Sequence, residues 1–256
     1  MWTLHGKSPG RRGATRRDID GNARGLVRRV VNGSRTWRVT ANYHLWRVGL
    51  RPLLPNYYIR HVPVRESGEP LIDLGDGPFG IDGRISVDQR ARSSVANALR
   101  EANSFLPQGN QLLVVEAFRS RERQEELWEL ARKKVQAENP LARPEEIRRL
   151  TGLLVADPSQ GSVNGHQTGG AIDLTLADRS GRELWMGTEV QEFTPATATK
   201  ARVPQEVGRR RSVLVHAMTR AGFVNYPAEW WHFSMGDRLW AAYSRQPYAR
   251  YGEAKE

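Results

Sequence analysis

The stretch that decides both the fold and the site reads Gly165-His166-Gln167-Thr168-Gly169-Gly170-Ala171-Ile172-Asp173. Its glycine-rich turn leads into a strand that we expect at residues 171–176. Side chains alternate between the two faces of a strand, so Asp173 points away from the apolar layer, as a ligand facing a cleft should. The opposite face carries three apolar side chains, Ile172, Leu174 and Leu176.

A second segment, Glu229-Trp230-Trp231-His232, completes a candidate metal site. His166, Asp173 and His232 are three good ligands for zinc, and a catalytic zinc site keeps three protein ligands and one open position. Glu229 is the kind of carboxylate that activates a metal-bound water, so these residues together suggest a zinc hydrolase. Glu229 and His232 are an odd number of positions apart, so a flat strand would place them on opposite faces. We therefore expect the chain to bend within the first three residues of this segment.

The alternative interpretation is that this segment has no chemical role. Glu229 would then be a surface charge, and His232 a satisfied core histidine between aromatic neighbours. Two independent segments that converge on one set of ligands favour the metal site instead.

Arg119 is the candidate donor to the oxyanion that forms when a peptide carbonyl is attacked. It follows a short buried strand predicted at residues 112–118, where a side chain emerges from a core element. The alternative is a surface ion pair with Glu122 or Glu126.

The basic charge of the chain is confined to its first segment. The formal net charge is +11, and residues 1–60 hold twelve Arg and one Lys against two Asp, so the rest of the chain is neutral overall. We interpret residues 1–69 as a basic, poorly ordered extension and linker, and residues 70–256 as the domain that holds the site. Binding of RNA or an anionic membrane surface by the basic arm is the alternative.

Composition narrows the chemistry further. The chain has no cysteine, which excludes disulfides and thiolate ligands, so a zinc ion must be held by nitrogen and oxygen. No apolar run approaches the roughly 18 residues needed to cross a bilayer, and no leader opens the chain. We expect a soluble protein that is not exported by a standard route.

Periodicity predicts helices and strands that do not alternate regularly, which favours an α+β fold over a doubly wound sheet. Ser86 and Gln89 resemble a capping box that opens the first helix. Ser120 can cap the second helix, on which we expect Leu130 to face inward. The expected helices cover residues 86–105, 120–134, a short segment from Pro144, and a segment from about Pro204; the expected strands cover 112–115, 171–176 and 231–235.

With these residues in place, the sequence resembles the D-alanyl-D-alanine metallopeptidases, and most of all the VanX-type D,D-dipeptidases of vancomycin resistance. The pattern of that family is Ser-x-His-x-x-Gly-x-Ala-x-Asp followed by Glu-x-x-His, and the resemblance covers about residues 110–245. It implies a small α+β domain with a mostly antiparallel central sheet flanked by helices and the site in a cleft. It also implies action on cell-wall precursors in the bacterial cytoplasm. By the resemblance one Zn²⁺ per chain is held by His166, Asp173 and His232, with Glu229 as general base and then acid and Arg119 at the oxyanion.

Departures from the family pattern fall where substrate is recognised. Asn164 replaces the serine two positions before the first histidine. Gln191 stands where the dipeptidases carry an aspartate that helps to hold the ammonium group of the substrate, and Glu189 or Glu192 are the alternatives for that task. We expect Asn164 and Gln191 to contact the substrate.

The sequence thus predicts zinc-dependent hydrolysis of D-alanyl-D-alanine or a similar D,D-dipeptide. A D,D-carboxypeptidase that trims longer peptidoglycan peptides is the alternative enzyme. An inactive hydrolase fold with a basic arm that binds nucleic acid or membrane is the alternative from another class. We expect a small peptide containing D-Ala as the partner and no specific nucleic acid.

Overall fold

The computed structural model describes residues 53–83, 88–152, 154–160, 163–192 and 194–255. Most of the basic extension and the predicted helix cap at Ser86 therefore lie outside the described residues. Within the described segments, no helix is both long and apolar enough to cross a membrane.

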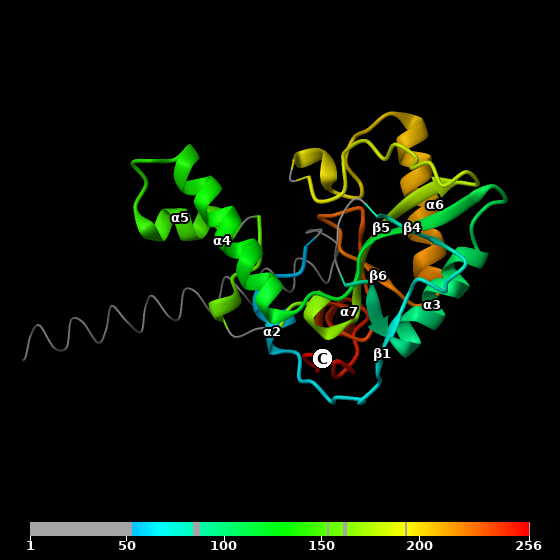
Figure 1. The fold of residues 1–256 in the computed structure, drawn as a ribbon, viewed down its shortest axis with the longest axis horizontal. Coiled ribbons are helices and arrows are strands. Elements are labelled where there is room, and N and C mark those ends of the chain that lie inside the picture. Colours follow the sequence, from blue (N-terminus) through cyan, green and yellow to red (C-terminus); the bar gives the residue numbers. More distant parts are fainter. Residues whose placement is uncertain (1–52, 84–87, 153, 161–162, 193, 256) are drawn as a thin grey trace, which may run out of the picture. The chain divides into compact units, whose positions relative to one another are not determined.

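A five-stranded sheet forms the centre of the fold (Figure 1). Only the first pair of strands is parallel, and the other three pairs are antiparallel. The predicted α+β fold with a mostly antiparallel sheet is therefore confirmed. In spatial order the strands are β2 (Gly80–Ile81), β4 (Asn110–Glu116), β5 (Ala171–Asp178), β7 (His232–Ser234) and β6 (Val224–Asn225).

Two helices, α3 (Ser93–Ser104) and α6 (Gln205–Arg220), pack against each other and supply much of the core (Figure 1). Their buried residues recur every three or four positions, which is the spacing of one helix face. The strand side chains that join this core include Ile172, Leu174 and Leu176 of β5. Asp173, on the opposite face of β5, lines a cavity. The alternation predicted for this strand is thus present in the structure.

The predicted start of the first helix was wrong. Residues Arg90–Arg92 form a short strand, β3, which pairs with β1 (Leu71–Asp73), and α3 begins only at Ser93. The cap comes from Glu69, whose carboxylate accepts hydrogen bonds from the backbone N–H and the hydroxyl of Ser94. A carboxylate is favoured at a helix N-terminus because it satisfies free N–H groups. Glu69 lies more than twenty residues before the start of α3, so a capping-box pattern, which compares positions three residues apart, cannot detect it.

Helices α4 (Arg121–Glu138) and α5 (Pro144–Thr151) lie away from α3 and α6 in Figure 1. The hydroxyl of Ser120 accepts from the N–H of Arg123, which confirms the predicted cap. Leu130, which we expected to face inward, is 59% exposed, because α4 packs mainly on the short α5 and not on the sheet. Three single 3-10 turns complete this region and the neighbouring loops: η1 (Pro158–Gln160), η2 (His166–Thr168) and η3 (Pro195–Thr197).

Two short helices from distant parts of the sequence pack together, α2 (Asn56–His61) and α7 (Arg238–Tyr243). Leu54, just before α2, is buried, and its N–H donates to the hydroxyl of Tyr243. The described part of the chain before residue 70 therefore contains a helix with packing partners. The domain boundary at residue 70 stays a prediction.

Two glycines with positive φ provide a test of the packing beside the site. A Cβ on Gly236 (φ +77°) would lie 2.2 Å from the ring of the buried Tyr251, whereas a Cβ on Gly222 (φ +94°) would meet nothing within 4 Å. We expect Gly222→Ala to destabilise the protein by about 1–2 kcal/mol through backbone strain alone. Gly236→Ala should lower the free energy of unfolding by about 1–3 kcal/mol more, because the added methyl group overpacks against Tyr251. Urea unfolding of both variants measures the difference, and equal losses would contradict the contact with Tyr251.

Candidate active site

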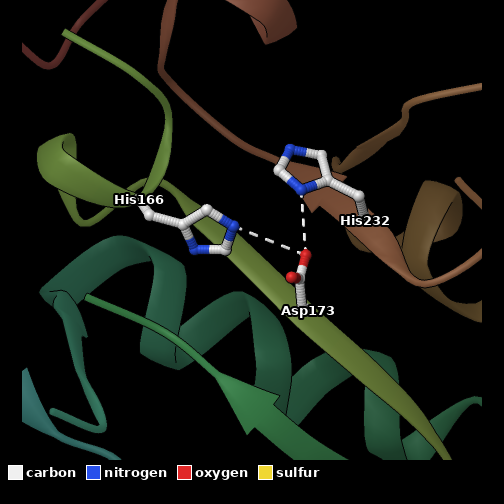
Figure 2. Close-up of side chains that lie close together, drawn as sticks. All are labelled: His166, Asp173 and His232. Carbon is white, nitrogen blue, oxygen red and sulfur yellow. Dashed lines mark hydrogen bonds and ion pairs between the residues drawn. The ribbon is translucent and has the colours of Figure 1, made fainter. Parts of the chain in front are cut away.

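Three elements bring the predicted ligands together (Figure 2). His166 begins the turn η2, Asp173 lies in β5, and His232 opens β7. Asp173 and His232 are direct partners in the antiparallel register of β5 and β7, so their side chains emerge on the same face. The turn ends at Gly169, whose φ of +68° lets the chain reverse from His166 into β5.

The geometry of these side chains fits a divalent metal. Nε2 of His166 lies 3.4 Å from Oδ1 of Asp173, and Nδ1 of His232 lies 2.9 Å from the same oxygen. A tetrahedral zinc with bonds of about 2.1 Å would hold its ligand atoms about 3.4 Å apart. Nδ1 of His166 is 2.8 Å from the carbonyl oxygen of Ala117. If Nδ1 carries the ring proton and donates it to that carbonyl, the lone pair of Nε2 is free to bind a metal ion. A hydrogen bond of this kind usually supports a metal-binding histidine.

The charges of the cluster also suit a cation. Burial would raise the pKa of Asp173, but the two histidines outweigh burial and hold this pKa well below its usual range. Burial would lower the pKa of His232, but the hydrogen bond and charge of Asp173 raise it to about 9. The carboxylate thus attracts positive charge to this position. A divalent ion competes with protons for the same lone pairs.

Glu229 lies in a turn just before β7, where its N–H donates to the carbonyl of Tyr226. The chain is not extended between Glu229 and His232, so the expected bend is present. Both residues line the same cavity of about 410 Å³ as His166 and Asp173. Burial raises the pKa of Glu229, which makes its carboxylate a better proton acceptor than an exposed one.

Arg119 lines the cavity as well, and its ion-pair partner is the buried Glu116. Its Nε and Nη2 donate to both oxygens of Glu116, at 2.7 and 2.5 Å, and its Nη1 donates to Oε1 of Gln124 at 2.9 Å. Burial would lower the pKa of Arg119, but the hydrogen bonds and charge of Glu116 raise it. The surface pair with Glu122 or Glu126 that we weighed as an alternative is absent among the described contacts. Arg119 is held rigidly by a buried carboxylate.

Asn164 and Gln191 line the cavity but are already occupied by protein groups. The amide of Asn164 donates to Oε1 of Gln124 at 2.8 Å. Nε2 of Gln191 donates to Glu116 at 2.5 Å and to Oδ2 of Asp173 at 3.1 Å. Gln191 therefore links the carboxylate of Glu116 to Oδ2 of Asp173, the oxygen that does not pair with the two histidines. Substrate contact by either residue stays a prediction.

Several residues that shape this site were missed by the sequence analysis. Gln124 accepts hydrogen bonds from two cavity residues and is almost fully buried, so it acts as a hub behind them. Arg211 donates to the carbonyls of Met186, Ala196 and Ala198 and so fixes the loop that carries Gln191. A lone Gln on an apolar helix face was the one available signal for Gln124. Arg211 sits among other arginines, and nothing in the pattern marks it.

Comparison with solved structures found VanY proteins. One is a VanY D,D-pentapeptidase variant from a VanB-type resistance cassette in complex with Zn(II), with a TM-score of 0.45 and 14% identity over 74% of this chain and 93% of that one. VanYB in complex with D-alanine-D-alanine gives a TM-score of 0.42, with 14% identity and the same coverage.

Comparison with curated proteins found two D-alanyl-D-alanine dipeptidases. The protein from Synechocystis sp. is 39% identical over 88 residues, which are 30% of this chain and 36% of the relative. The protein from Escherichia coli (strain K12) is 34% identical over 128 residues, 50% of this chain and 56% of the relative. The matches thus span at most 56% of the length of these relatives.

The family model described as D-Ala-D-Ala dipeptidase, peptidase M15, matches residues 80–251. This range contains the cluster of His166, Asp173 and His232 together with Glu229 and Arg119. The family expected from the sequence is confirmed. The chain belongs to the D-Ala-D-Ala dipeptidase family of M15 peptidases.

Proposed function

We propose that the protein hydrolyses D-alanyl-D-alanine, or a similar D,D-dipeptide, with one zinc ion held by His166, Asp173 and His232. The observation that carries the proposal is their convergence in one cavity with the half-buried Glu229. Sequence similarity to two D-alanyl-D-alanine dipeptidases supports the substrate class. The cytoplasmic place of action expected from the resemblance remains part of the proposal.

Each side chain of the cavity has a separate task in this mechanism. Zinc would supply Lewis acidity, polarising the peptide carbonyl and making water more acidic. Glu229 takes the proton of the attacking water and returns it to the nitrogen of the leaving amine. Arg119 stabilises the charge that develops on the carbonyl oxygen, because Glu116 and Gln124 hold its guanidinium in a fixed orientation.

A direct assay tests the proposal. Purified full-length protein is incubated with zinc and D-Ala-D-Ala, and free D-alanine is measured over time. We expect release that depends on zinc and disappears with a chelator. Absence of release by a folded, zinc-loaded protein would count against this substrate.

A D,D-carboxypeptidase is the second candidate, and the contacts of Gln191 favour it. A dipeptidase must hold the free ammonium group of its substrate, yet Gln191 carries no charge and its amide is committed to Glu116 and Asp173. Two substrates separate the candidates: a pentapeptide ending in D-Ala-D-Ala, and D-Ala-D-Ala with an acetylated amine. A dipeptidase prefers the free dipeptide, whereas a carboxypeptidase cleaves the blocked and longer peptides.

Arg119→Gln should lower kcat by about 10²–10³-fold, because an oxyanion donor acts mainly in the transition state. Zinc content should not change, since Arg119 is not a ligand. Arg132→Gln is the matched control: Arg132 makes an equally close pair with Glu129 on the exposed surface of α4. Steady-state kinetics of both variants give the comparison, and a similar small loss in each would contradict the role of Arg119.

A further inference from the structure

Three arginines line the cavity, Arg60, Arg119 and Arg238, and the proposed chemistry uses only Arg119. Arg60 has an interaction partner, so Arg238 is the one to consider. It is the first residue of α7 and lies half-buried. Its Nε is buried without a hydrogen-bond partner, and its side chain makes no ion pair with any other described residue. Arg119, in the same cavity, shows the opposite situation, because Glu116 and Gln124 engage its guanidinium. Of the three arginines that line the cavity, Arg238 is therefore the one whose side chain makes no hydrogen bond or ion pair with another described residue.

The carboxylate next to Arg238 in the sequence is engaged elsewhere and does not pair with it. Asp237 is buried and caps α7, since its Oδ1 accepts from the N–H of Trp240. Its Oδ2 accepts from the hydroxyl of Ser234, which also lies 3.4 Å from Nε2 of His232. These contacts fix the start of α7 relative to the metal ligands. Arg238 is thus carried by a backbone that is anchored beside the site.

An arginine in this state is unfavourable for the protein alone. A guanidinium that is partly removed from water loses hydration, and without a partner nothing in the protein compensates for the loss. An anionic ligand would supply the compensation, and the planar guanidinium matches a carboxylate with two parallel hydrogen bonds. The availability of Arg238 inside the reaction cavity therefore points to an anion that arrives with the substrate.

We propose that Arg238 binds the C-terminal carboxylate of the peptide substrate. This inference rests on the proposed peptidase function and specifies how the substrate is selected. A dipeptide spans at most about 7 Å when extended, and a cavity of about 410 Å³ that is lined by both the proposed metal ligands and Arg238 has room for it. An enzyme with this anchor cleaves next to a free C-terminus and rejects a peptide whose chain continues beyond that point.

The test compares two ligands that differ only in this charge, D-Ala-D-Ala and its C-terminal amide. Binding is measured by calorimetry in the zinc-loaded Glu229→Gln protein, so that turnover does not interfere. With Arg238 intact, we expect the acid to bind about 10- to 100-fold more tightly than the amide. Arg238→Gln should weaken binding of the acid by the same factor and leave binding of the amide unchanged. Arg209→Gln, at an exposed position of α6, is the matched control and should alter neither.

Three results would overturn the inference: no binding of the acid, equal affinity for acid and amide, or an equal loss of both in Arg238→Gln. The last would indicate that the substitution distorts the cavity. Because the guanidinium has no partner in the described structure, Arg238→Gln should also unfold at the same temperature as the parent protein or higher. Binding of the acid through Arg238 without any hydrolysis by the parent protein would contradict the proposed reaction but not the carboxylate site.

Discussion

Replacing Glu229 with glutamine should lower kcat by about 10²–10⁴-fold and leave the zinc content unchanged. The amide has the shape of the carboxylate but cannot accept the proton of the attacking water, and general-base catalysis typically contributes a factor of this size. Burial raises the pKa of Glu229, so the ionised group is a stronger base than an exposed glutamate. The measurement is kcat and KM for D-Ala-D-Ala, with zinc determined by atomic absorption on the same sample.

The pattern of the change distinguishes a catalytic from a structural role. Loss of a group that acts on the proton should appear in kcat, because ground-state binding of the peptide is preserved. Glu145→Gln, an exposed substitution in the first turn of α5, is the control and should leave both constants unchanged. A Glu229→Gln protein that retains most of its kcat, or that loses zinc along with activity, would contradict the assignment of Glu229 as the base.

The sequence predicted those parts of the fold that depend on neighbours in the chain. Alternation along β5 predicted which face carries Asp173, and the cap at Ser120 was visible because its N–H partner is three residues away. The start of α3 was not predictable in the same way. Its cap is Glu69, more than twenty residues earlier, and it reaches Ser94 only after β1 and β3 have paired. Contacts that depend on tertiary pairing leave no periodic signal.

The same distinction, between features set by neighbours in the chain and contacts set by tertiary packing, applies to the candidate site. Its candidate reactive residues lie in two short motifs, and a metal site restricts ligand identity so strongly that the clustering of His166, Asp173 and His232 could be predicted from spacing and residue type. Their role as ligands stays a prediction. The groups behind Arg119 could not be predicted, because Glu116 and Gln124 meet it through buried hydrogen bonds between a strand end and a helix. Many polar side chains would satisfy such a role. Sequence reasoning therefore singled out Arg119, whose role as oxyanion donor stays a prediction, but not the buried groups that hold it.

Asp173→Asn should have the largest effect, because Asp173 is the one carboxylate among the three proposed ligands and pairs with both histidines. Its Oδ1 lies 3.4 Å from Nε2 of His166 and 2.9 Å from Nδ1 of His232. The substitution removes the only negative charge among the three ligands and leaves a weak amide oxygen in its place. Partners behind metal ligands typically contribute 10–100-fold to metal affinity. Loss of the ligand itself should exceed that range, so we expect at least about a 10²-fold weaker zinc affinity and no detectable hydrolysis at stoichiometric zinc.

Zinc-dependent stabilisation provides a readout that does not require activity. An ion present at 100 times its dissociation constant stabilises the native state by about 2.7 kcal/mol, so zinc should raise the unfolding temperature of the parent protein. This increase should largely disappear in Asp173→Asn. Asp178→Asn, at the far end of the same strand, is the control: it loses the ion pair with Arg182 but should keep the full response to zinc. An undiminished response in Asp173→Asn would place the ion elsewhere, because two imidazoles alone cannot match the affinity of a ligand set that includes the carboxylate.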